Sequence, residues 1–158
     1  MSEAWLHFAV IISVQLLLFF ALAYYQKKLS SAKPLLVNGL LIGLVFGLTF
    51  DFVFGRLLGL ASYELGSVTL FVLLNAVLSY GLYSATMLLF QRSRLVHLFA
   101  CSFLVMAVYE ITNHFFRVWT WEFSLQAIPF LVVLTVGYFG GTVLVVSVGR
   151  IVLKHRLT

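Results

Sequence analysis

Acidic residues are scarce in this chain. Only five of its 158 residues are Asp or Glu, against ten Lys or Arg, and charged residues together make up 9% of the sequence. Soluble domains carry about 25% charged residues. Because hydrophobic residues make up 63% of the chain, the composition excludes a soluble globular domain and predicts an integral membrane protein.

The chain also lacks the motifs that mark common enzymes and metal sites. Its single cysteine, Cys101, excludes an intrachain disulfide. The sequence contains no glycine-rich phosphate loop, no nucleophile elbow, and no Ser or Cys beside a plausible base. A Cys pair and a His-Glu-x-x-His motif are absent too. We therefore predict no cofactor and no metal ion.

Long apolar stretches are what the chain has in abundance. A helix needs about 20 apolar residues to cross the hydrocarbon core of a bilayer. Five stretches reach that length: Trp5 to Tyr25, Leu35 to Gly55, Val68 to Phe90, Leu95 to Phe116, and Leu125 to Gly149. They lack the alternation of apolar and polar residues that marks strands of membrane barrels. We therefore predict an all-α, polytopic membrane protein, with residues 1–158 forming one domain of five transmembrane helices.

The charges are segregated, and this predicts an orientation. The five acids fall at one set of predicted helix ends: Glu3, Asp51, Glu64, Glu110 and Glu122. Eight of the ten Lys and Arg fall at the other ends, within residues 27–33, 92–94 and 150–156. By the positive-inside rule the basic side is cytoplasmic. We predict an outside N-terminus, a cytoplasmic C-terminus, and a place in the inner membrane of a bacterium.

The basic residues do not predict a nucleic-acid partner. They are spread over three short segments rather than gathered on a soluble domain. Membrane insertion and contact with anionic headgroups explain this distribution better. The predicted partners are therefore membrane lipids and a lipid-like small molecule, together with a second copy of the chain or a membrane subunit.

Two parts of the chain resemble each other. The matched positions are Asp51 with Glu110, Arg56 with Arg117, Tyr63-Glu64 with Trp121-Glu122, and residues 81–86 with residues 137–142. A duplication would relate helices two and three to helices four and five as parallel hairpins about an axis along the membrane normal. The alternative is chance likeness between short apolar helices.

Small residues recur at helical spacing in both hairpins. Gly39, Gly43 and Gly47 lie four residues apart in the second stretch, and Gly137 and Gly141 repeat the spacing in the fifth. Small residues at this spacing let transmembrane helices approach closely. We interpret them as helix-packing positions, with a groove for a ligand or partner as the alternative.

The fourth stretch carries the densest group of polar residues. Glu110, Asn113, His114 and Arg117 occur at i, i+3, i+4 and i+7, and therefore project from one helical face. A continuous polar face is unfavourable against acyl chains, so we predict that it points inward. In an enzyme, Asp51, Glu110 and His114 would be the acid–base groups. Otherwise Glu110, His114 and Arg117 form an intrahelical network that satisfies its own hydrogen bonds and sets the helix register.

A carboxylate and an imidazole at i, i+4, such as Glu110 and His114, can reach one metal ion. Such a site would need at least one further ligand, and no signature supplies it.

The predicted outer connections are rich in aromatic residues. Tyr63 lies in the first, and Trp119, Trp121 and Glu122 lie in the second. Aromatic residues near the membrane–water interface form an interfacial belt in many membrane proteins. Alternatively, with Asn113 and Arg117, they would form a ligand-binding cage at the outer leaflet.

The repeated unit resembles that of the small membrane lycopene-cyclase domains. In both, an acid at a helix end is followed about a dozen residues later by an aromatic pair, here Asp51 to Tyr63-Glu64 and Glu110 to Trp119-Thr120-Trp121. A similar spacing occurs in small multi-span proteins of Gram-positive bacteria. The resemblance implies carboxylic acids that protonate an isoprenoid double bond. The chain departs from it because the Pro-x-Glu-Glu motif of the cyclases is missing.

Two functional hypotheses follow. The first is a non-enzymatic membrane subunit, sensor or binder of a small ligand or lipid, with a polar site near the outer leaflet. The second is a lipid- or isoprenoid-directed enzyme that uses paired carboxylates. The first is preferred, because five short helices enclose little space for a reaction.

Overall fold

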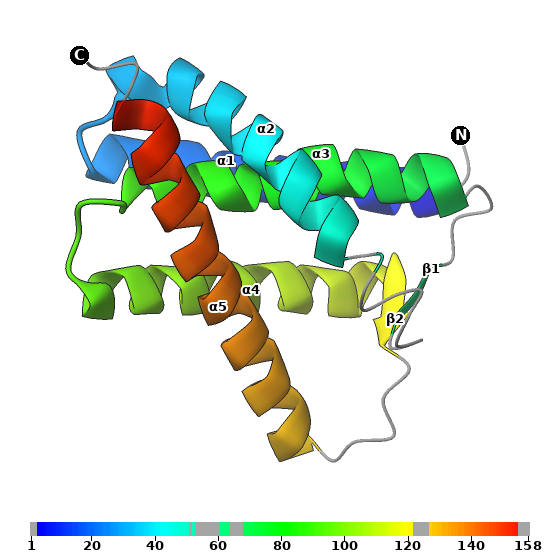
Figure 1. Cartoon of the computed structure of the whole chain (residues 1–158). Helices are drawn as coiled ribbons and strands as arrows, with labels where there is room; N and C mark the ends of the chain where they lie inside the picture. The colour runs from blue at the N-terminus through cyan, green and yellow to red at the C-terminus, as the bar shows by residue number, and fades with distance from the viewer. Residues whose placement is uncertain (1–2, 51, 53–60, 64–67, 122–126, 155–158) are drawn as a thin grey trace.

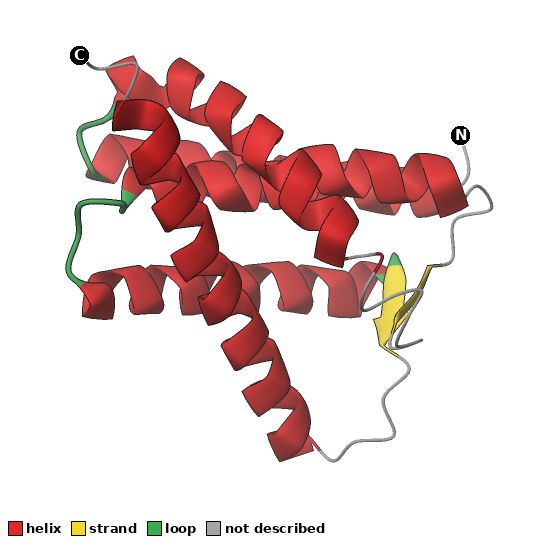
Figure 2. Cartoon of the chain, viewed as in Figure 1, coloured by secondary structure: helices red, strands yellow, loops and turns green. Residues whose placement is uncertain are grey.

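Five helices account for most of the chain. The structure is a computed structural model that describes residues 3–50, 52, 61–63, 68–121 and 127–154. The helices are α1 (Glu3–Tyr25), α2 (Ala32–Phe50), α3 (Val68–Leu89), α4 (Leu95–Phe116) and α5 (Ala127–Lys154), and a short 3-10 turn, η1 (Leu29–Ser31), precedes α2. Figures 1 and 2 show them gathered into one bundle. The predicted helical bundle is confirmed, and α4 has the predicted bounds.

The helices have the length and composition of membrane-spanning segments. Four stretches qualify by both criteria: Glu3–Tyr25, Leu29–Phe50, Leu70–Leu89 and Leu95–Phe116. Within α5 the apolar stretch Thr135–Ile151 is shorter. Many large apolar side chains on the outer faces are exposed, including Leu17, Val45 and Phe115. In a membrane, lipid chains would cover these apolar faces. Soluble monomers rarely expose large contiguous apolar surfaces to water.

Helix α3 lies at the centre of the bundle. Every residue from Gly81 to Phe90 is buried. These residues join the main apolar core, to which Phe19 of α1, Leu35 of α2 and Val145 of α5 contribute. A second core around Phe8, Phe71 and Tyr109 lies between α1, α3 and α4. Each of the other helices therefore contacts α3, and α4 packs against α1 and α5 as well.

A small sheet joins two connections that the sequence presents as loops. Strand β1 (Ala61–Tyr63) precedes α3, and β2 (Trp119–Trp121) follows α4. They pair antiparallel, with Ser62 opposite Thr120. Figure 1 places this sheet at the end of the bundle where α4 finishes. It ties the connection before α3 to the connection before α5.

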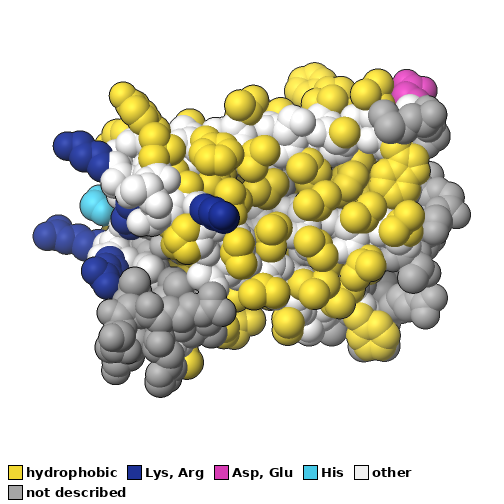
Figure 3. All heavy atoms as spheres, turned by 90° about the horizontal axis from the view of Figure 1, so that it is seen from above, with side chains coloured by type: hydrophobic (Ala, Val, Ile, Leu, Met, Phe, Trp, Pro, Cys, Tyr) yellow, Lys and Arg dark blue, Asp and Glu magenta, His cyan; other side chains and the backbone are white. Residues whose placement is uncertain are grey.

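The described charges lie at opposite ends of the bundle. In Figure 3 the Lys and Arg side chains on the visible face gather near one end, and the acidic side chain lies at the other. The acid at the start of α1 is Glu3, and the basic end includes Lys28, Lys33, Arg92 and Arg94. The charge segregation in the sequence is thus a segregation in space.

Candidate functional site

Glu110 lies where α4 meets α5. Its side chain is half-buried. The Tyr138 hydroxyl, from α5, donates a hydrogen bond to Glu110 Oε1 at 3.2 Å. Sequence reasoning did not associate Tyr138 with Glu110. The contact places a carboxylate at the crossing of two membrane-type helices, where it has a phenol as a partner.

The four polar residues of α4 do not all point inward as expected. Asn113 is buried and Glu110 is half-buried, but His114 and Arg117 are exposed. The prediction of one inward-facing row is therefore wrong for His114 and Arg117. His114 lies within α4, where one residue of helix, about 100° of rotation, separates it from the buried Asn113 and turns it outward. Arg117 follows the end of α4 at Phe116 and adopts a left-handed conformation, with φ of 48°. This turns the chain away from the face on which Glu110 and Asn113 lie.

Asn113 has a structural task at this helix end. Its backbone oxygen accepts a hydrogen bond from the Arg117 N–H at 2.6 Å. Its side-chain Oδ1 accepts another from the Val118 N–H at 3.0 Å. Helix ends leave backbone groups without intrahelical partners, and a side chain can satisfy them. Asn113 therefore shapes the turn from α4 into β2.

Several candidate residues fall wholly or partly outside the described residues. Asp51 and Glu122 lie outside them, and so do the side chains of Tyr63, Trp119 and Trp121. The backbone of Tyr63 lies opposite that of Trp119 in the sheet. The two aromatic connections are thus brought together at the end of the bundle nearest to Glu110.

A buried cluster of hydroxyls, which sequence reasoning missed, joins α3, α4 and α5. The Tyr83 hydroxyl donates to the backbone oxygen of Tyr138 at 2.7 Å and lies 3.1 Å from Ser102 Oγ. It also contacts Thr142 Oγ1. Thr142 Oγ1 in turn donates to Ser102 Oγ at 2.8 Å. We call Tyr83, Ser102 and Thr142 the hydroxyl cluster.

Polar residues on α3 continue from the hydroxyl cluster. Asn75, Ser79 and Tyr83 follow one another at intervals of four residues and are all buried. The Tyr109 hydroxyl donates to Asn75 Oδ1 at 3.1 Å. Ser79 Oγ is buried without a hydrogen-bond partner among the described residues. This i, i+4 spacing of polar residues in an apolar helix was the available sequence signal.

Helix α5 is anchored along only part of its length. Its later part contributes the buried residues Thr142, Val145 and Val146. Earlier in the helix Val136 is exposed, and a Cβ atom added to Gly137 or Gly140 would meet no atom within 4 Å. In Figure 1 this earlier part runs away from α4. Tyr138, the partner of Glu110, lies where the anchored part gives way to the open part.

The site contains no evident metal centre within the described residues, where no group of three His, Cys, Asp or Glu is close enough to hold an ion. The groups that meet at the crossing of α4 and α5 are the Glu110 carboxylate and the Tyr138 hydroxyl. No protein-family model, curated protein or solved structure matches the chain.

Proposed function

We propose that the chain is a non-enzymatic membrane protein that binds a lipid-like molecule by its polar head at Glu110. The observation that carries the proposal is the half-buried Glu110 carboxylate, held by the Tyr138 hydroxyl at an apolar helix crossing. An ionisable group within a membrane helix is costly, and such groups commonly mark functional sites. A head group that donates hydrogen bonds would satisfy the carboxylate.

The open part of α5 supports lateral access to this site. A lipid-like molecule reaches such a site from the bilayer, with its chain against apolar helix faces. Gly137 directly precedes Tyr138, and a Cβ atom added to Gly137 would meet no atom within 4 Å, so the helical face beside Tyr138 is uncovered there. The proposed ligand would lie along α5 with its head beside Glu110.

We also propose that the basic end of the bundle is cytoplasmic and that the chain resides in the inner membrane of a bacterium. The support is the gathering of Lys and Arg at one end, which the positive-inside rule assigns to the cytoplasm. Glu3 and the Glu110 site would then face the outer leaflet. Reporter fusions at the two termini test this orientation, and equal cytoplasmic signals from both would contradict it.

We also propose that the chain contains an internal repeat, and the register of the small sheet supports this proposal. Ser62 lies opposite Thr120 in an antiparallel pair, and such a pair has a local two-fold axis. Rotation about an axis between these residues carries Tyr63 onto Trp121. This is the correspondence that the sequence match requires. The same rotation would relate the α2–α3 hairpin to the α4–α5 hairpin.

The ligand proposal is tested with a photoreactive analogue of farnesol, a short isoprenoid alcohol, added to the purified protein in lipid nanodiscs. We expect labelling of peptides from α4 or α5, and about tenfold weaker labelling in Glu110→Ala, because an acceptor for the head group is lost. Glu110→Gln should retain most of the labelling, since an amide oxygen still accepts a hydrogen bond.

The matched control is Glu3→Gln, which alters an exposed acid at the start of α1. It should label like the wild type. Equal labelling of all variants would contradict a site at Glu110. Conversion of the probe by the wild type, lost in Glu110→Gln, would replace binding by acid–base catalysis, because an amide cannot deliver a proton.

A further inference from the structure

Three basic side chains from three segments meet at the C-terminal end of α3. Lys28, from the α1–α2 connection, donates from Nζ to the backbone oxygen of Leu89. Arg150 of α5 donates from Nε and Nη2 to the backbone oxygen of Gln91, at 3.2 and 2.7 Å. Arg92 lies in the connection that follows α3. We call Lys28, Arg92 and Arg150 the basic cluster.

Lys28 is positioned by an uncommon backbone conformation. The preceding residue, Lys27, has a positive φ of 53°, a region that non-glycine residues seldom adopt. The Lys27 N–H donates to the Tyr24 oxygen at 2.9 Å, and the Lys28 N–H donates to the Ala23 oxygen at 2.8 Å. This is the Schellman pattern of helix termination, in which glycine is usual. The turn directs the Lys28 side chain toward α3.

Among the described residues, no acid forms an ion pair with the basic cluster. All five acids lie elsewhere in the sequence, so that residues 4–50, 65–109 and 123–158 contain no Asp or Glu. Arg92 is exposed and makes no hydrogen bond or ion pair with a described residue. Burial lowers the pKa of Lys28, and the charge of Arg92 lowers it further. Two cations are therefore held close enough to repel each other.

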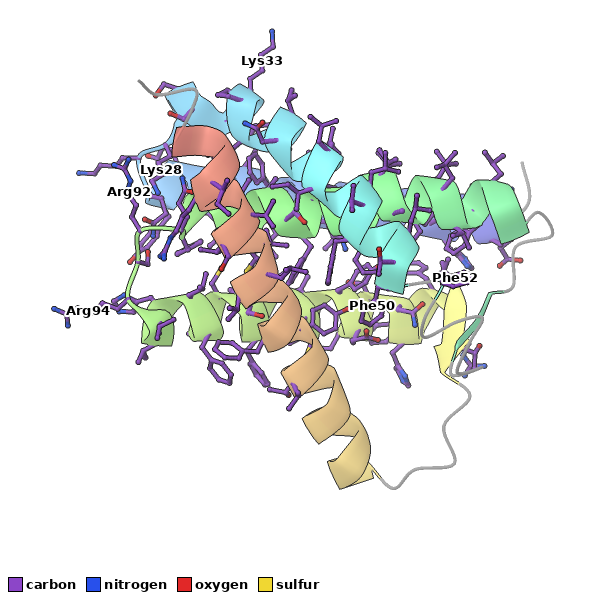
Figure 4. All side chains as sticks on the ribbon, in the orientation of Figure 1. Lys28, Lys33, Phe50, Phe52, Arg92 and Arg94 are labelled. Carbon is purple, nitrogen blue, oxygen red and sulfur yellow. The ribbon has the colours of Figure 1, made fainter. Side chains whose placement is uncertain are left out.

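Such an arrangement is suited to binding an anion. The position of the basic cluster at the helix ends indicates which kind of anion it binds. Figure 4 shows Lys28 and Arg92 near one another, whereas Lys33 and Arg94 extend in other directions. Arg and Lys together bind phosphate well, through planar paired donors and a point charge respectively. The cluster lies at the ends of membrane-type helices, which is the depth of the headgroups in one leaflet.

We infer that the basic cluster of Lys28, Arg92 and Arg150 binds the phosphate of an anionic phospholipid in the leaflet at this end of the bundle. The two carbonyl contacts hold Lys28 and Arg150 in place, and Arg92 supplies a guanidinium that no described residue occupies. The inference is independent of the proposed site at Glu110, because it concerns the opposite end of the helices.

The test is native mass spectrometry of the purified protein in a neutral detergent, with phosphatidylglycerol or phosphatidylcholine added. A neutral micelle has no anionic surface, so generic attraction of the basic residues is removed. We expect phosphatidylglycerol adducts at lower lipid concentration than phosphatidylcholine adducts. Arg92→Gln should weaken phosphatidylglycerol binding about fivefold, the effect of one basic residue near an anionic headgroup. Lys28→Gln should weaken it as well.

Arg94→Gln is the matched control, since it removes an exposed arginine two residues away that points elsewhere. It should bind phosphatidylglycerol like the wild type. Equal losses in Arg92→Gln and Arg94→Gln would overturn the site in favour of diffuse attraction. Equal binding of the two lipids would also overturn it. Competition by equimolar inorganic phosphate would assign the cluster to a soluble phosphate instead of a lipid.

Discussion

The two hairpins of the bundle are built differently. In α2–α3, three glycines of α2 contact α3 directly. A Cβ atom added to Gly39 would lie 2.5 Å from that of Ala85, and one added to Gly43 would overlap the backbone of Gly81. In α4–α5, a Cβ atom added to Gly137 would meet no atom within 4 Å. The first hairpin is closed by these glycine contacts, and the second is open at the described residues Val136 and Gly137 of α5.

The first hairpin is the scaffold of the bundle, and the second contains the candidate site. Close backbone approach through small residues is a strong packing mode in membranes, where the hydrophobic effect does not drive helices together. At α5, hydroxyls add to the apolar contacts of Val145 and Val146, since Tyr83 of α3 contacts Thr142 and the backbone oxygen of Tyr138. A hydrogen-bonded attachment at one part of a helix leaves the remainder free to face a ligand. Glu110 and Tyr138 lie in this second hairpin.

The largest expected effect comes from filling the glycine contact. Gly43→Ala should destabilise the protein by about 2 kcal/mol, because the new methyl group meets α3 backbone that cannot move aside. Gly137→Ala should instead be neutral or stabilising by up to about 1 kcal/mol, through helix propensity. The measurement is thermal unfolding in detergent. Similar losses in both variants would mean that the second hairpin is closed as well.

A smaller loss is expected from the hydroxyl cluster. Tyr83→Phe removes a hydroxyl that contacts Ser102, Thr142 and the backbone of Tyr138. Hydrogen bonds between membrane helices contribute about 0.6 kcal/mol on average, so losing this group should cost about 1 to 2 kcal/mol. Tyr24→Phe is the control, because Tyr24 is exposed on α1. If the two variants unfold alike, the hydroxyls do not hold α5.

Removing the backbone strain at Arg117, in the connection that follows α4, should stabilise the protein rather than destabilise it. Arg117 is left-handed, a conformation that costs an L-residue about 1 to 2 kcal/mol. Arg117→Gly should therefore raise the unfolding free energy by about 1 kcal/mol. Arg94→Gly, at the other end of α4, should not, because Arg94 is extended, with φ of −63°. A destabilised Arg117→Gly would indicate that the side chain itself holds the turn.

Much of the fold could be predicted, because a span is a property of a continuous segment. The apolar run alone defined Leu95–Phe116. The glycine spacing in α2 also indicated its packing face, since Gly39, Gly43 and Gly47 are buried there. These local sequence signals predict the structure because an apolar segment in lipid must form a helix to satisfy its own backbone hydrogen bonds.

The candidate site was less predictable, because it depends on which faces meet. Glu110 could be singled out as an ionisable residue in a span, but its partner Tyr138 lies 28 residues away on another helix. The outward position of Arg117 depends on its left-handed conformation, which a non-glycine residue does not indicate in the sequence. The strands are three residues long, too short for a periodic pattern to reveal.

The smallest expected effect is a pH dependence of stability that distinguishes the Lys28 contact from the Arg150 contact at the end of α3. Lys28 attaches the α1–α2 connection, and Arg150 attaches α5. Burial and the charge of Arg92 lower the pKa of Lys28 from 10.5. Between the lowered value and 10.5, the unfolded chain binds more protons than the folded chain, so stability should rise slightly with pH. The guanidinium of an arginine keeps its proton in proteins, so this pH dependence is a property of the lysine contact.

Lys28→Met is the comparison that isolates this effect. Its stability in neutral detergent should lack the rise toward pH 10.5, while every other titratable residue is the same in both proteins. The difference between the two pH profiles therefore belongs to Lys28. Phosphatidylglycerol should flatten the wild-type profile, because a bound phosphate favours the charged amine. A wild-type profile that falls relative to Lys28→Met in this range would show that the folded state favours the charged form of Lys28 even without lipid.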